Sequence, residues 1–262
     1  MLINYHTHTV RCNHAANVPD AAYAEAALEA GLRELGFADH VPYPFEEQHF
    51  SGCRMRCADL PDYMASLTSL KEAYAGRLDI HIGFEAEYYP DYFDKLLDML
   101  APYPCEYLIL GQHFIGNEIG EPYNGQPTDS AERMRAYGEQ CKRALATKRF
   151  SYFAHPDVLR FTGDEAVYRE VSRDLCRAAK GMEIPLEFNL LGFIEHRHYP
   201  RRAFWEEAAV VGNEVILGWD AHSPNWMKQP EKEAEARAYL GALGLTVTDS
   251  LRLLDPLYDR KS

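Results

Sequence analysis

Histidines and carboxylates recur along this chain where short apolar runs end. Neutral imidazole binds zinc, iron and manganese, and a carboxylate can bridge two ions. Seven histidines with two carboxylates are too many for one tetrahedral site, so the set predicts two or three divalent ions that keep open positions for water and substrate. The predicted metal ligands are His6, His8, His14, His40, Glu85, His113, His155, Asp220 and His222.

The spacing of the first two histidines supports this interpretation. His6 and His8 are two residues apart at the end of an extended run, so both side chains point to one face and can bind one ion. The remaining histidines do not follow strands in this way. They are interpreted as surface or core residues: His49, His81, His196 and His198.

The elements that must position these residues alternate regularly. Strands are predicted over residues 2–5, 34–38, 79–84, 107–110, 152–154, 186–189 and 215–219, and helices over 19–30, 61–75, 91–100, 130–147, 164–180 and 201–211. Such alternation indicates a parallel sheet with outer helices. Without a dinucleotide-type glycine loop, an α/β barrel is favoured over an open sheet. The carboxyl ends of its strands would carry the active site. One domain spanning residues 1–262 is expected.

Composition restricts the partners. The net charge of −13 disfavours long nucleic acid, although a small anionic substrate remains compatible if the pocket itself is positive. No apolar run approaches the roughly 18 residues of a membrane helix, and no secretory signal is recognised, so a cytoplasmic protein without membrane association is expected. The six cysteines are expected to be reduced, and a zinc pair at Cys53 and Cys57 is disfavoured because no second pair exists.

The ordered motifs resemble those of the polymerase and histidinol phosphatase (PHP) superfamily. They are His6-Thr7-His8, His14, Asp39-His40, Gly83-Phe84-Glu85, Gln112-His113, Ala154-His155-Pro156 and Gly218-Trp219-Asp220-Ala221-His222. The resemblance implies a distorted (β/α)7 TIM-like barrel with three divalent ions, either zinc, manganese or iron. It implies a first ion on His6, His8, Glu85 and Asp220, a second on His14, His40 and His222, and a third on Glu85, His113 and His155. Glu87 is the competitor of Glu85 for the bridging role.

Within the superfamily, the segments GFEAEYYP, LGQHFIG and HPDVLRF are most similar to monofunctional histidinol-phosphate phosphatases. The implied reaction is hydrolysis of L-histidinol phosphate to L-histidinol and phosphate, with a hydroxide that bridges two ions attacking phosphorus. Glu85 and Asp220 are the predicted catalytic residues.

Arginines after strands are candidate phosphate ligands, because a guanidinium can donate two parallel hydrogen bonds to phosphate. Arg160 and Arg197 are predicted to bind substrate, whereas Arg54 and Arg56 are interpreted as solvated loop residues. The alternatives left open are another small phosphoester (nucleotide, sugar phosphate or phosphotyrosine), a non-catalytic metal-binding accessory domain, and amide or lactone hydrolysis. The sequence makes no prediction of oligomeric state.

Overall fold

Seven parallel strands form one sheet in the computed structural model, which describes residues 1–45, 49 and 51–259. Each strand pairs in parallel with the next in chain order. The strands are β1 (Ile3–Asn4), β2 (Glu34–His40), β3 (Asp79–Ala86), β4 (Tyr107–Leu110), β5 (Tyr152–Phe153), β6 (Leu186–Asn189) and β7 (Val215–Gly218). The predicted barrel is therefore confirmed, with strands that vary in length from two to eight residues.

The first and last strands approach each other across a seam. Just beyond them, Thr7 and Ala221 form a parallel bridge. The backbone N–H of His8 donates to the carbonyl of Ala221 at 3.0 Å, and the side chain of Asn4 accepts from the N–H of Trp219 at 3.0 Å. The barrel is thus nearly closed, and the seam brings the motif after β1 beside the motif after β7.

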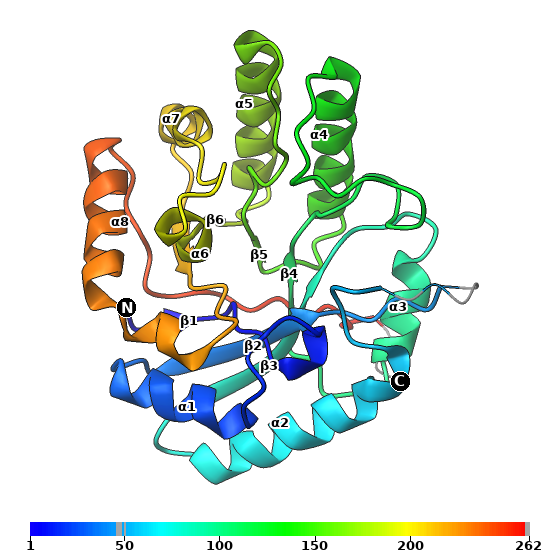
Figure 1. Cartoon of the computed structure of the whole chain (residues 1–262), viewed down its shortest axis with the longest axis vertical. Coiled ribbons are helices and arrows are strands. Elements are labelled where there is room, and N and C mark those ends of the chain that lie inside the picture. The colour runs from blue at the N-terminus through cyan, green and yellow to red at the C-terminus, as the bar shows by residue number, and fades with distance from the viewer. Residues whose placement is uncertain (46–48, 50, 260–262) are drawn as a thin grey trace.

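Helices surround the strands (Figure 1). They are α1 (Asp20–Glu29), α2 (Leu60–Tyr74), α3 (Phe93–Leu100), α4 (Ala131–Ala146), α5 (Glu165–Gly181), α6 (Leu190–Ile194), α7 (Arg202–Val211) and α8 (Pro230–Ala242), with 3-10 helices η1 (Val10–Cys12), η2 (Cys57–Asp59) and η3 (Pro224–Lys228). The six predicted helices begin and end within two residues of the expected positions, whereas α6 and α8 were not predicted. In the part of the chain that the structure describes, no helix is long and apolar enough to cross a membrane.

Local chemistry explains where the helices begin. The side chain of Ser130 accepts from the N–H of Arg133 before α4, and Asp164 accepts from the N–H of Ala166 before α5. Both are preferred N-cap residues. The short helix α6 begins in the same way, because Asn189 accepts from the N–H of Gly192 at 2.9 Å. That cap turns the chain directly after β6, which is why a helix starts there without a connecting loop.

Alternation along the strands separates an inner and an outer core. On β3, Ile80, Ile82, Phe84 and Ala86 pack outward against the helices, so the odd-numbered residues face the interior. The barrel interior is filled by a second buried cluster: Ile3, Tyr5, Ala38, Tyr107, Ile109, Tyr152, Ala154 and Ile216. The interior is thus packed below the rim, and only the rim is left for a site.

Strands β2 and β3 extend two residues further than predicted. Their register pairs Ala38 with Gly83 and His40 with Glu85, so the last residues remain in the ladder. His40 and Glu85 therefore lie within the strands rather than after them. The ladder holds these two site residues side by side.

Candidate metal centre

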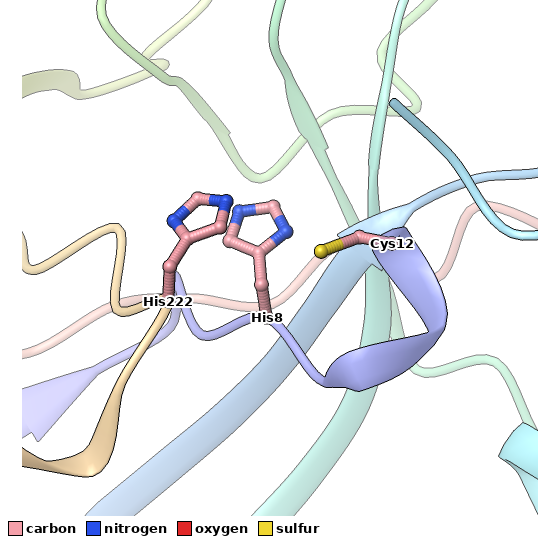
Figure 2. A group of neighbouring side chains, drawn as sticks. All are labelled: His8, Cys12 and His222. Atoms are coloured by element: carbon pink, nitrogen blue, oxygen red, sulfur yellow. The ribbon is translucent and has the colours of Figure 1, made fainter. Parts of the chain in front are cut away.

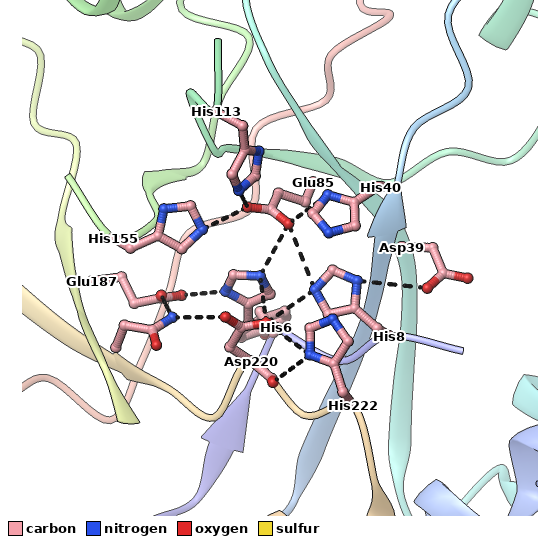
Figure 3. Close-up of polar contacts among 12 residues, drawn as sticks. His6, His8, Asp39, His40, Glu85, His113, His155, Glu187, Asp220 and His222 are labelled. Carbon is pink, nitrogen blue, oxygen red and sulfur yellow. Dashed lines mark hydrogen bonds and ion pairs between the residues drawn. The ribbon is translucent and has the colours of Figure 1, made fainter. Parts of the chain in front are cut away.

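Glu85 lies at the middle of a histidine cluster at the carboxyl ends of the strands (Figure 3). Its carboxylate is 1% exposed. The distance to Oε1 is 2.7 Å from His155 Nε2 and 3.4 Å from His113 Nε2. The distance to Oε2 is 3.0 Å from His40 Nδ1, 3.4 Å from His6 Nε2 and 3.5 Å from His8 Nε2. Five histidines from four separate segments thus converge on one carboxylate.

Asp220 and His222 complete the cluster from the other side of the seam. Asp220 Oδ1 is 3.2 Å from His8 Nε2 and 3.5 Å from His6 Nε2. His222 Nε2 is 2.8 Å from His14 Nε2. The structure therefore brings together all nine residues that the sequence nominated as ligands.

Several subsets have donor atoms close enough to share an ion. The donor atoms of each subset lie within 4.8 Å of one another: His14 with His40 and His222, His6 with His8 and Glu85, His6 with His155 and Asp220, and His40 with Glu85 and His113. The first subset has the same members as the second ion implied by the family resemblance. Glu85 belongs to two of the other three subsets, as a bridging carboxylate would.

Two of these residues adopt a left-handed backbone conformation. His155 follows β5 with φ 28° and Asp220 follows β7 with φ 49°. This region is sparsely populated for residues with a Cβ, and such conformations cluster at functional sites. Both residues turn the chain out of its strand, which aims their side chains at the centre.

Buried atoms of the cluster fit a set of divalent ions. Buried nitrogen and oxygen atoms are normally hydrogen-bonded. Here six atoms with almost no solvent exposure make no hydrogen bond: His6 Nε2, His8 Nδ1 and Nε2, His40 Nδ1, His155 Nδ1 and Glu85 Oε2. Imidazole nitrogens and carboxylate oxygens are the donors that zinc, manganese and iron accept. The residues present therefore match the metals that the family resemblance implies.

Burial and the neighbouring charges shift the pKa values of the cluster residues in both directions. Burial lowers the pKa of His8 to about 3, with repulsion from His222 adding to it, and burial holds the pKa of His40 well below its usual value. Burial opposes ionisation of Glu85 and Asp220, but the facing histidines hold both carboxyl pKa values well below the usual range. Neutral His8 and His40 are in the protonation state that metal ions require. Burial opposes protonation of His6, His155 and His222 as well, but the facing carboxylates raise their pKa values, so a bound ion would displace protons from these three.

Glu187 was not predicted as a site residue. Its side chain is fully buried on β6, and Oε2 lies 2.8 Å from His6 Nδ1. Asn189 Nδ2 donates to Glu187 Oε1 at 2.8 Å and to Asp220 Oδ2 at 3.2 Å. A carboxylate behind a histidine fixes its tautomer and ring orientation. The available signal was an acidic residue inside the apolar strand run Leu186–Asn189.

Two glycines leave room for the buried carboxylates. A Cβ built on Gly111 would overlap the Glu85 carboxylate, and one on Gly218 would overlap that of Glu187. A side chain at either position would displace a carboxylate that contacts the cluster histidines.

Glu87, the competitor of Glu85, lies behind His113 instead of inside the cluster. Its Oε1 is 3.0 Å from His113 Nδ1, and Arg54 contacts the same carboxylate at 2.9 Å. The interpretation of Arg54 as solvated is wrong, because its side chain is 2% exposed. The buried carboxylates Glu87 and Glu118 draw its guanidinium inside. Arg56, by contrast, is exposed and pairs with Asp59.

Cys12 lies beside His8 and His222 (Figure 2). Donor atoms of the three residues fall within 4.8 Å of one another. The two imidazole rings, however, stack with centroids 4.1 Å apart and planes at 16°. Nitrogen lone pairs lie in the ring planes, so stacked rings do not aim both at one ion beside them. Cys12 is fully buried, and this arrangement does not make it a metal ligand with these two histidines.

A cavity of about 530 Å³ opens above the cluster. Its floor contains seven of the nine predicted ligands. Its other lining residues are Cys53, Phe114, Tyr123, Leu191, Glu195, Arg197, Tyr199 and Trp226. Arg197 donates to the Tyr199 hydroxyl at 3.0 Å and pairs with Glu195. Arg160 is exposed and is not among the lining residues.

Known proteins resemble this chain in sequence and in fold. The chain is 30% identical over 234 residues to a Deinococcus radiodurans protein named "Probable histidinol-phosphatase", covering 85% of this chain and 87% of that protein. It is 33% identical over 116 residues to the Bacillus subtilis histidinol-phosphatase, covering 42% and 43%. The crystal structure of histidinol phosphate phosphatase from Lactococcus lactis, complexed with zinc, L-histidinol and phosphate, shares the fold. It superposes with a TM-score of 0.72 at 22% identity, over 95% of this chain and 96% of that one.

The family model of the PHP domain matches residues 4–190. This range contains the motifs from His6 to His155, and the motif after β7 completes the cluster across the seam. The chain therefore belongs to the PHP domain family.

Proposed function

We propose that this protein is a metal-dependent phosphomonoester hydrolase whose substrate is L-histidinol phosphate. The observation that carries the proposal is the convergence of nine donor residues, seven of which line the floor of one cavity, with six buried donor atoms that make no hydrogen bond. Two relatives are named for this activity, and the Lactococcus lactis protein holds zinc together with L-histidinol and phosphate, the two products of this hydrolysis.

The ions would be held by the residues that the family resemblance implied: His6, His8, Glu85 and Asp220 for one, His14, His40 and His222 for another, and Glu85, His113 and His155 for a third. Bound divalent ions supply Lewis-acid polarisation of the phosphate and lower the pKa of an attacking water. Their positive charge would attract a phosphate dianion to this cavity although the chain has a net charge of −13.

The residues of the chain have distinct parts in the proposed reaction. Glu85 faces the histidines of several subsets and fixes their relative positions. Asp220 lines the cavity floor, where its Oδ2 is held by Asn189 and its Oδ1 faces His6 and His8. There Oδ1 can orient a water and accept its proton. We assign these two residues the catalytic roles.

Arg197 is the better placed of the two candidate phosphate ligands. It lines the cavity, and its contacts with Tyr199 and Glu195 orient the guanidinium. Arg160 would have to reach the phosphate from an exposed position outside the cavity lining. We therefore expect Arg197→Ala to raise the KM for the phosphoester more than Arg160→Ala does. Steady-state kinetics of the two variants test this order, and an equal or reversed effect would contradict it.

Phosphate release after metal removal and reloading tests the proposal itself. Protein stripped with a chelator is reloaded with zinc, manganese or iron and offered L-histidinol phosphate, a nucleotide, a sugar phosphate and phosphotyrosine. A clear preference for L-histidinol phosphate, absent without metal, is expected. Faster phosphate release from another ester would support metal-dependent phosphoester hydrolysis but would contradict L-histidinol phosphate as the substrate. No release from any ester by metal-loaded protein would favour the accessory-domain alternative.

A further inference from the structure

We propose that Arg54 is a positioning residue, which fixes His113 through Glu87 and so determines how tightly this side of the centre holds metal. The inference rests on the metal centre of the proposed function. Arg54 lies in the long connection between β2 and α2 and touches none of the nine predicted ligands in the contacts described here. Its effect on the centre therefore has to pass through another side chain.

All three nitrogens of the Arg54 guanidinium contact carboxylate or carbonyl oxygens. Nη2 contacts Glu87 Oε1 at 2.9 Å and Glu118 Oε2 at 2.6 Å. Nη1 donates to Glu87 Oε2 at 3.1 Å and to the carbonyl of Val41 at 2.9 Å. Nε donates to Glu118 Oε2 at 2.7 Å. With a 2% exposed side chain, such a network permits one arrangement of the two carboxylates.

Glu87 transmits this arrangement to the centre. Both of its oxygens contact Arg54, and Oε1 also lies 3.0 Å from His113 Nδ1. With Nδ1–H donating to Glu87, the His113 lone pair is on Nε2, the nitrogen that faces Glu85 at 3.4 Å. The order Arg54–Glu87–His113 therefore fixes both the tautomer and the orientation of the ring.

Arg54 also joins three segments at the rim. Its backbone carbonyl accepts from Asn13 Nδ2 at 2.8 Å, in the segment that carries His14. Its side chain binds the carbonyl of Val41, next to His40, and the carboxylate of Glu118, in the connection that follows His113. Segments bearing three candidate ligands are thus anchored at one residue.

Lysine could not substitute for this arginine. Glu87 and Glu118 are contacted by different edges of one planar fork, whereas an ammonium group is a point charge without that geometry. We therefore expect Arg54→Lys to weaken metal binding although it keeps the charge.

Metal titration of matched variants tests the proposal. Zn²⁺ affinity is measured by competition with a chromophoric chelator for the full-length wild type, Arg54→Lys, Arg54→Met and Glu87→Gln. Co²⁺-loaded protein gives an absorption spectrum that reports coordination geometry. Loss of an outer partner of a ligand typically weakens metal binding about 10–100-fold. We expect this loss and an altered Co²⁺ spectrum in all three variants.

Arg56→Met is the control, because Arg56 lies two residues away in the same segment but is exposed and pairs with Asp59. It should bind Zn²⁺ as the wild type does. The loss in the double variant Arg54→Met/Glu87→Gln should be smaller than the two single losses added together, since Arg54 and Glu87 act on His113 in series. If Arg54→Met does not fold by circular dichroism, Arg54→Lys and Glu87→Gln carry the test.

Wild-type affinity and an unchanged Co²⁺ spectrum in folded Arg54 variants would overturn the proposal, as would additive losses in the double variant. The titration uses ions alone and no ester. Failure of the protein to hydrolyse L-histidinol phosphate would therefore contradict the proposed substrate, while the metal titrations would still test the role of Arg54.

Discussion

The two ends of the barrel differ in the partners that their polar side chains have. At the carboxyl rim, carboxylates and imidazoles converge below an open cavity, and six buried donor atoms make no hydrogen bond. At the opposite end, Glu106 Oε1 pairs with Lys71 at 2.5 Å and lies 3.8 Å from His81 Nδ1, while Oε2 accepts from the N–H of Ile82. Most charges there find a partner within the protein. The six rim atoms without a hydrogen bond are donors that a metal ion can bind.

The chain itself also closes the lower end. Beyond α8, the N–H of Thr248 donates to the carbonyl of Val215, and Leu251 and Leu253 pack against the inner core. Further along, Arg149 donates to the carbonyl of Pro256 at 2.7 Å. The comparison teaches that one end of the barrel is arranged for stability and the other for ligand binding. Strand β3 spans both ends, with His81 and Glu85 on its inward face.

The largest expected effect separates the two ends by activity. His8→Ala removes an imidazole that faces both Glu85 and Asp220, so phosphate release should fall by more than about 100-fold, the upper end of the loss for an outer partner. His81→Ala, at the lower end, is the matched control and should keep activity close to wild type. Similar losses in both variants would break the comparison.

A smaller effect is expected from the carboxylate behind His6. Glu187→Gln leaves an oxygen near His6 Nδ1 but removes the charge that orients the ring, so Zn²⁺ affinity should fall about 10–100-fold. Competition titration measures it. Glu34→Gln at the lower end, where Glu34 accepts from the Tyr5 hydroxyl, is the control. Unchanged affinity in Glu187→Gln would show that Glu187 has no influence on the centre.

The lower end should respond in stability instead of activity. Leu253 is partly buried against the inner core, so Leu253→Ala should lower the free energy of unfolding by about 1–3 kcal/mol. Metal affinity and kcat should stay at wild-type values. Val210→Ala is the control, since Val210 is 76% exposed and a surface change costs about 0.5 kcal/mol or less. Loss of activity without loss of stability would contradict this division.

The smallest expected effect is on the stability of the protein at acidic pH. Burial opposes ionisation of Glu106, but the nearby His81 imidazole and hydrogen bonds from Lys71 and the N–H of Ile82 lower its pKa from 4.5 to about 2. A lowered folded-state pKa stabilises the fold above the unfolded-state value, and this contribution is lost as pH falls from about 4.5 through 2. The difference in unfolding free energy between wild type and Glu106→Gln should therefore shrink over that range. Denaturant melts at several pH values measure it, and a constant difference would refute the assignment.

The sequence predicted the barrel because its evidence is local. Apolar runs alternate with helix-periodic stretches, and the chain places a donor residue at the end of most runs, so parallel strands must bring the donors to one rim. Helix α6 was missed because its five residues are too few to show a helical period. The length of β2 and β3 was underestimated because the pairing of His40 with Glu85 depends on the neighbouring strand.

The sequence by itself therefore determined the fold class and which donor residues share the rim. Only the tertiary structure decided which carboxylate lies behind which histidine. Glu187 and His6 are 181 residues apart, and Arg54 is 64 residues from Glu118. No periodic pattern connects such positions, because their contacts arise from closure of the barrel and from the path of its loops. Burial then decided their roles, since a charge taken out of water must find a partner.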